Sequence, residues 1–179
     1  NEKPYVIYGY AAVPSGETLV VNAGARVHFH ENSGIIVAEG ASMECNGAPS
    51  SDPIVLENEI IFEGDRLEPS FADIPGQWAT IWLTADSNDG DLTLSLNDVQ
   101  IYNSSNVGLL VRNGNVYGEN LVINNSGQSS LAISLGGTYN FNHSTFGNYW
   151  ANSFRSFPTV QIDNIIPEVA EADLIEANF

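Results

Sequence analysis

The sequence repeats itself at spacings of 22 and 23 residues, and this repeat constrains the fold more than any other feature. Asn103, Asn125 and Asn148 mark equivalent positions, because 125 − 103 is 22 and 148 − 125 is 23. Hydrophobic residues stand two and nine positions before each asparagine, so the strand pleat keeps its phase from unit to unit. Each unit holds three short strands and lacks the fixed leucine spacing of leucine-rich repeats. Such a unit is typical of a right-handed parallel β-helix.

Strand-like runs recur along the rest of the chain. Short alternating runs of β-branched and aromatic residues are separated by Gly, Asn, Asp and Ser at intervals too short for helical crossovers. We interpret the first half as opening units of the same repeat, with strands that include residues 18–21, 26–29, 35–37, 54–56 and 60–62. Residues 62–78 and 148–158 break the pattern and are expected to be long loops.

The predicted fold is therefore all-β: a right-handed parallel β-helix with repeat units of about 22 residues and two long loop excursions. Residues 1–179 are expected to form a single domain that is a fragment of a longer chain. Cys45 is the only cysteine, so no disulfide can form within the chain. Alternation around Cys45 predicts a small buried core residue.

Charge excludes several kinds of partner. The chain has 22 Asp and Glu against 5 Lys and Arg, a formal charge of −17. Nucleic acid needs clustered basic residues, and here they are scattered singly. No stretch approaches the roughly 20 apolar residues of a membrane span, so direct membrane insertion is not expected. The acidic, Asn-rich and Ser-rich composition favours an exported protein.

Five segments of the chain show a recognisable pattern, at residues 4–10, 64–68, 74–78, 136–143 and 148–150. They resemble segments of right-handed β-helix surface proteins of Bacteroidetes-type bacteria. The resemblance covers nearly the whole chain and implies an extracellular or outer cell-surface location, with a lipoprotein anchor outside this fragment. It implies no established activity. Members of the group often carry Cys where this chain has Ser144, and no role is assigned to that Cys.

The wider fold class contains pectate lyases and polygalacturonases, but fold does not fix function. Lyases of that class need calcium-binding carboxylates beside an Arg or Lys base, and the hydrolases need close Asp residues on one strand face. Residues 92–133 carry only Asp98 and Glu119 as acids and Arg112 as a base. We therefore expect a non-catalytic cell-surface binding or scaffold module for glycans or another surface protein. The alternative is a polysaccharide-active enzyme, which needs a groove with three or more carboxylates and a base.

Aromatic residues near the two predicted loops are the candidate ligand contacts. Exposed rings stack on sugar faces, whereas buried rings pack an irregular loop against the sheet. Arg66 stands among carboxylates, either pairing with them to hold the loop or recognising a ligand carboxylate or hydroxyl. The candidate ligand-binding residues are Trp78, Trp82, Tyr149, Trp150 and Arg66.

The candidate metal ligands are Asp86, Asp89 and Asp91, whose oxygens share one turn as calcium prefers. The spacing is not that of an EF-hand, and a solvated loop is the alternative. No other cofactor is expected. His28 and His30 share a strand face and would bind metal only with a third ligand from a neighbouring unit.

The equivalent asparagines are expected to stack. Asn103, Asn125 and Asn148 would lie above one another at a bend, where their amides can form hydrogen bonds along the stack. This is a structural role. The alternative is a row of glycan-binding amides, which requires the same side chains to face solvent.

Overall fold

The computed structural model describes residues 4–52, 54–84, 94–147, 159–163 and 176–178. Within these ranges the chain forms strands and one 3₁₀ turn, η1 (Pro69–Phe71), which confirms the all-β prediction. Every strand pair described is parallel, and the strands form two sheets.

The first sheet has six strands, paired in the order in which the chain visits them. Ile101 pairs with Phe62 on one side and with Ile123, 22 residues later, on the other. Equivalent positions of the repeat therefore lie side by side. The strands are, in order, β1 (Tyr5–Ile7), β4 (Arg26–Phe29), β7 (Ile60–Gly64), β10 (Val99–Tyr102), β12 (Val122–Asn124) and β14 (Thr145–Gly147).

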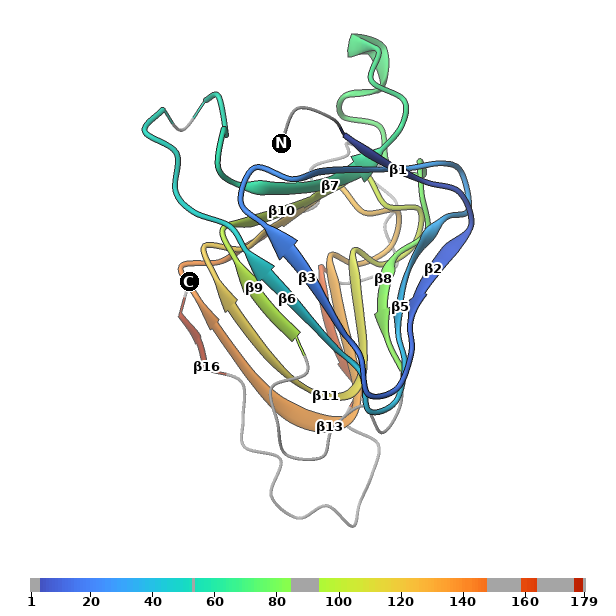
Figure 1. Ribbon diagram of the computed structural model, residues 1–179, viewed down its shortest axis with the longest axis vertical. Coiled ribbons are helices and arrows are strands. Elements are labelled where there is room, and N and C mark those ends of the chain that lie inside the picture. The colour runs from blue at the N-terminus through green and yellow to red at the C-terminus, as the bar shows by residue number, and fades with distance from the viewer. Residues whose placement is uncertain (1–3, 53, 85–93, 148–158, 164–175, 179) are drawn as a thin grey trace.

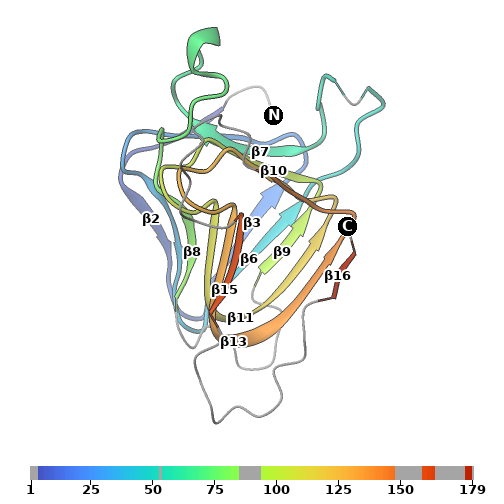
Figure 2. The same ribbon diagram turned by 180° about the vertical axis from the view of Figure 1, so that it is seen from behind.

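The second sheet is larger and bends within two long strands, β11 (Leu109–Glu119) and β13 (Leu131–Asn142). The first part of β11 pairs with β8 and its second part with β9, with a register shift against β13 between Arg112 and Gly114. Figures 1 and 2 show two groups of strands diverging from this bend, with the six-stranded sheet across the third side. One group contains β2 (Tyr10–Val13), β5 (Gly34–Val37), β8 (Ile81–Leu83) and β15 (Val160–Asp163), and the other β3 (Thr18–Asn22), β6 (Ser42–Asn46), β9 (Leu94–Asn97) and β16 (Glu176–Asn178).

Left-handed backbone turns the chain at equivalent places in successive units. Asp98, Asn120 and His143 have φ angles of 49°, 52° and 48°, and they directly follow β9, β11 and β13 respectively. Asp, Asn and His are the non-glycine residues that most readily adopt this conformation. The Asn120 amide donates to the Asp98 carboxylate across 3.1 Å, which joins two units at this corner. Sequence analysis did not identify this row.

The core lies between the sheets and is formed by inward-facing residues of both. Phe29 stacks on Trp78 with ring centroids 4.3 Å apart and also contacts the Phe62 ring. Cys45 is buried as predicted, and burial raises the pKa of its thiol well above the usual range. Other inward-facing residues of β9 to β13 are also buried: Leu96, Ile101, Leu109, Val111, Ile123, Leu131 and Ile133.

One predicted strand is wrong. Ile54 and Val55 lie in an exposed turn rather than in a strand. The Ile54 N–H donates to the Asp52 carboxylate and the Val55 N–H to the Asp52 carbonyl. Asp52 thus closes a local turn that satisfies backbone groups a strand would need for pairing.

Candidate functional site

Two loops project beyond the six-stranded sheet, one from each end of β7 (Figure 1). Residues 47–52 and 54–59 precede β7, and residues 65–77 follow it. We call the second segment the 65–77 loop. It lies within the excursion predicted from the sequence at residues 62–78.

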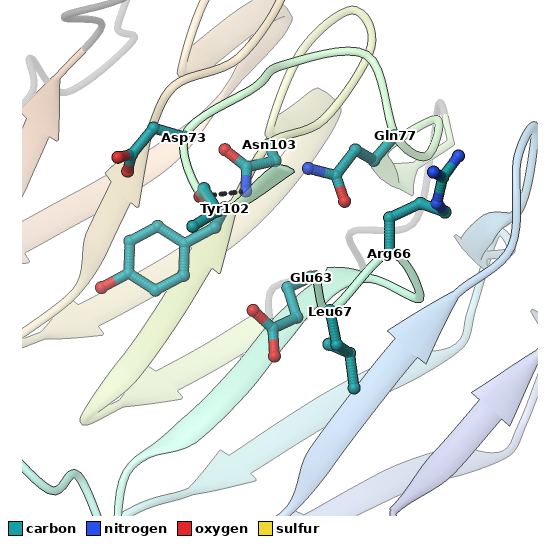
Figure 3. Close-up of a pocket in the computed structure, with 8 residues that line it drawn as sticks. Glu63, Arg66, Leu67, Asp73, Gln77, Tyr102 and Asn103 are labelled. Carbon is teal, nitrogen blue, oxygen red and sulfur yellow. Dashed lines mark hydrogen bonds between the residues drawn. The ribbon is translucent and has the colours of Figure 1, made fainter. Parts of the chain in front are cut away.

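A pocket of about 480 Å³ lies at the base of the 65–77 loop. Glu63 comes from the end of β7 and Tyr102 from the end of β10, the neighbouring strand. Most of the other lining residues come from the loop itself. Figure 3 shows the Glu63 carboxylate directed to the same side as the Tyr102 ring, with the Arg66 guanidinium turned away from it. This loop pocket is lined by Glu63, Arg66, Leu67, Ala72, Asp73, Gln77, Tyr102 and Asn103.

Stacked asparagines hold the loop over the sheet. The Asn125 amide donates to the Asn103 side-chain oxygen across 2.7 Å and to the Asp73 carbonyl across 2.6 Å. The Asn103 amide donates to the Ala72 carbonyl across 2.9 Å. Asn103 is 4% exposed and Asn125 is 1% exposed, whereas a row of glycan-binding amides would have to face solvent. Asn148 lies outside the described residues.

Gln77 and Trp78 fix the return of the loop to the sheet. The Gln77 amide donates to the carbonyls of Phe71 and Ile74 across 2.6 and 2.8 Å. The Trp78 indole N–H donates to the Tyr102 carbonyl across 2.7 Å. Trp78 is 0% exposed, so its ring has no face left for a sugar. The prediction that Trp78 contacts a ligand is therefore corrected, because the whole ring is packed in the core.

Trp82 is the other aromatic candidate among the described residues, and it does not line this pocket. Trp82 lies half-buried on β8, in the larger sheet, and is not among the lining residues. Its indole nitrogen is buried without a hydrogen-bond partner in the part of the chain that the structure describes. Tyr149 and Trp150 lie outside the described residues.

The Arg66 side chain interacts mainly with residues of its own loop. Its guanidinium lies 3.8 Å from the centre of the Phe71 ring, and its Nε faces the Glu68 carboxylate at 3.3 Å. Both charged side chains are about half exposed, so this ion pair contributes little to stability. Arg66 nevertheless lines the pocket, and Glu68 rather than Glu63 balances its charge.

Glu63 is a partly buried charge in the loop pocket with incomplete compensation. Its carboxylate lies 3.5 Å from His28 Nδ1, and the two side chains are 29% and 9% exposed. Burial raises the pKa of Glu63, and the nearby His28 and Arg26 offset only part of this effect. His28 Nδ1 itself has no hydrogen-bond partner among the described residues.

The two histidines predicted to share a face each lie beside a carboxylate. His30 Nδ1 lies 2.7 Å from the Asp65 carboxylate, two residues further along the chain from the His28–Glu63 contact. Across the described ranges, no three His, Cys, Asp or Glu side chains are grouped so that they could hold a metal ion. The candidate calcium ligands Asp86, Asp89 and Asp91 lie outside those ranges.

A second pocket, of about 360 Å³, opens beside β1 and β3 and is mainly apolar. Asn22 and Tyr5 are the residues with polar side-chain groups among those that line it. With so few groups to orient a ligand, this pocket is a weaker candidate for a small-molecule site.

Most residues of the loop pocket were missed by sequence analysis. Arg66 and Asn103 were singled out, but Glu63, Gln77 and Tyr102 were not. A usable signal existed for Tyr102, because it directly precedes the repeated asparagine and alternates with the buried Ile101. No comparable signal marks Glu63, whose partner His28 is 35 residues earlier.

The chain matches no protein-family model, and no curated protein or solved structure is similar to it at a significant level. Within the ranges that the structure describes, it has no helix with the length and hydrophobicity needed to cross a bilayer. Interpretation of the pocket therefore rests on its own geometry.

Proposed function

We propose that the chain is a right-handed parallel β-helix that serves as a non-catalytic binding module at the outer surface of a cell, with the loop pocket as a glycan site. The strand registers support the fold. Tyr5 pairs with Val27 and Gln100 with Val122, each 22 residues apart. Larger offsets occur where a loop is inserted, as between Phe62 and Ile101.

The observation that carries the glycan assignment is the composition of the loop pocket. A half-buried tyrosine ring and the carboxylates of Glu63 and Asp73 line the same pocket. Aromatic faces pack against the apolar face of a sugar, and planar polar groups bind its hydroxyls. The volume of about 480 Å³ falls within the range typical of small-ligand sites.

The same lining favours binding over catalysis. Two carboxylates and one guanidinium line the loop pocket, fewer than the three carboxylates with a base that the lyase chemistry requires. Arg66 is a poor candidate base, because a guanidinium stays protonated and this one faces Glu68.

A polysaccharide-active enzyme is the second candidate, and Glu63 is the observation that favours it. Burial raises the pKa of this pocket-lining carboxyl, as a general acid for glycoside cleavage requires. Incubation with neutral glycans and polyuronates, followed by assays for reducing ends and for ultraviolet-absorbing unsaturated products, distinguishes the two. The binding proposal expects neither product.

The binding proposal is tested by a glycan-array screen, with and without calcium, followed by titration of the best ligand. Tyr102→Ala should weaken binding by about tenfold or more, since it removes the stacking surface. Tyr117→Ala is the matched control. Tyr102 and Tyr117 are both half-buried, and the hydroxyl of each donates to a side chain two residues away on its own strand. Equal losses in the two variants would show that the loop pocket is not the site.

A further inference from the structure

The loop pocket has an excess of negative charge. Glu63, Asp73 and Arg66 are its charged lining residues, and Glu68, which does not line it, balances Arg66. The field of the whole chain, with a net charge of −17, has the same sign. A cationic group entering the pocket is therefore favoured at both short and long range.

Among the described residues, Glu63 has no full countercharge. His28 on β4 approaches it only to 3.5 Å. Arg26 also lies on β4. Its guanidinium donates to the carbonyls of Glu59 and Leu56, in the loop at the other end of β7. A partly buried carboxylate with such partners gains most from a ligand that brings its own positive charge.

Tyr102 supplies a second attraction for a cation. It follows Ile101, which pairs with Phe62, so Tyr102 and Glu63 are neighbours on adjacent strands. Figure 3 shows the ring and the carboxylate on the same side of the loop pocket. An ammonium group is stabilised by a carboxylate and by the face of an aromatic ring.

We propose that the loop pocket recognises an amino sugar, with the primary ammonium group between the Glu63 carboxylate and the Tyr102 ring. This rests on the proposed glycan-binding function and specifies the class of sugar. An N-acetylated sugar presents a neutral amide in the same place and loses the contact with Glu63. A uronate presents a carboxylate and is repelled.

The test is calorimetric titration of the whole chain with a glucosamine tetramer and with its fully N-acetylated counterpart, which share one backbone. The free amine should bind about tenfold or more tightly, which corresponds to about 1.4 kcal/mol. Glu63→Gln should remove this preference, so that the two tetramers bind with equal affinity. Glu119→Gln is the control, because it removes a carboxylate outside the loop pocket that binds His143.

The outcomes separate this inference from the function on which it rests. Equal affinity for the two tetramers, or an amine preference that survives Glu63→Gln, overturns the amino-sugar inference and leaves glycan binding intact. Loss of the preference in both glutamine variants identifies a general charge effect and also overturns it. If neither tetramer nor any arrayed glycan binds, the proposed function fails as well. Circular dichroism of each variant confirms that the sheets are retained.

Discussion

The side-chain amide of Asn125 donates to the side-chain oxygen of Asn103 across 2.7 Å, although the two residues are 22 positions apart in the chain. The same Asn125 amide also bonds the carbonyl of Asp73, 52 positions away. One buried side chain therefore joins two repeat units and the loop that forms the pocket. Loop position and repeat stacking are mechanically linked.

Asn125→Ala should lower the free energy of unfolding by about 1 to 3 kcal/mol, because buried carbonyl and amide groups lose their partner. Asn125 also has a φ of 61°, which alanine adopts poorly. Asn32→Ala is the control for this backbone effect, since Asn32 has a φ of 59° but is exposed. Urea unfolding of both variants measures the difference. Equal losses would mean that the buried amide adds nothing.

Ile123→Ala should cost about 2 to 5 kcal/mol, as truncations in well-packed cores do. Ile123 is fully buried between neighbouring units. Val122→Ala, one residue away and half-buried, should cost much less. The midpoints of chemical unfolding compare the two, and similar shifts would contradict the inward orientation of Ile123.

Glu59 and Glu63, four residues apart, should show opposite dependence of stability on pH. Burial alone would raise the pKa of Glu59, but hydrogen bonds from the Ser50 N–H and hydroxyl outweigh it and lower the pKa. A lowered folded-state pKa stabilises above the unfolded value and is lost as the pH falls through the folded value. Glu59→Gln should therefore destabilise at neutral pH, with a difference that shrinks in acid below about pH 4.

For Glu63 the sign reverses, because burial raises its pKa in the folded state. The unfolded chain then ionises first as the pH rises, and stability falls until the folded-state pKa is passed. Glu63→Gln should be more stable than the parent at neutral pH and similar to it in acid. Thermal unfolding across the pH range measures both variants. A Glu63→Gln variant that is less stable at neutral pH would contradict the assigned cause.

The first repeat unit should promote self-association. Among the described strands, β1, β2 and β3 each pair with only one neighbour, and residues 4–24 contain a single charged residue, Glu17. Natural edge strands are usually protected by charge. Val20→Lys places a charge on this edge, beside Glu44 on β6, and should reduce association without loss of stability.

Light scattering over a range of concentrations measures this effect. Ile54→Lys is the control, because Ile54 is also exposed but lies in a turn away from the strand edges. The prediction is contradicted if the parent chain stays monomeric at high concentration or if the two lysine variants behave alike.

The periodic part of the fold could be predicted because the spacing of the repeat counts the residues between stacked strands. Ile101 and Ile123 align in the sequence and pair in the sheet for that reason. Residues 54–56 were misread because hydrophobicity alone suggested a strand, while the preceding Asp52 closes a turn. The loop pocket escaped prediction because its side chains come from an aperiodic loop and from strands distant in sequence.

Trp78 shows the same limit in another form. Its place in the 62–78 excursion suggested an available ring, yet stacking on Phe29 buries it. Those two residues are 49 positions apart, as 78 − 29 shows, and no local pattern links them. The contacts that an inserted loop makes depend on where the loop returns to the sheet. The spacing of the sequence repeat does not determine that point.

The corner rows, with Asp98, Asn120 and His143 in one and Asn103 and Asn125 in the other, also constrain how such a chain can evolve. A residue lost from one corner removes a partner from the next, so tolerated changes should covary at steps of 22 or 23 positions. Insertions within a strand would shift its later residues out of register, whereas insertions between strands, such as the 65–77 loop, leave the rows aligned. New binding surfaces can therefore arise by lengthening loops while the stacked frame is inherited unchanged.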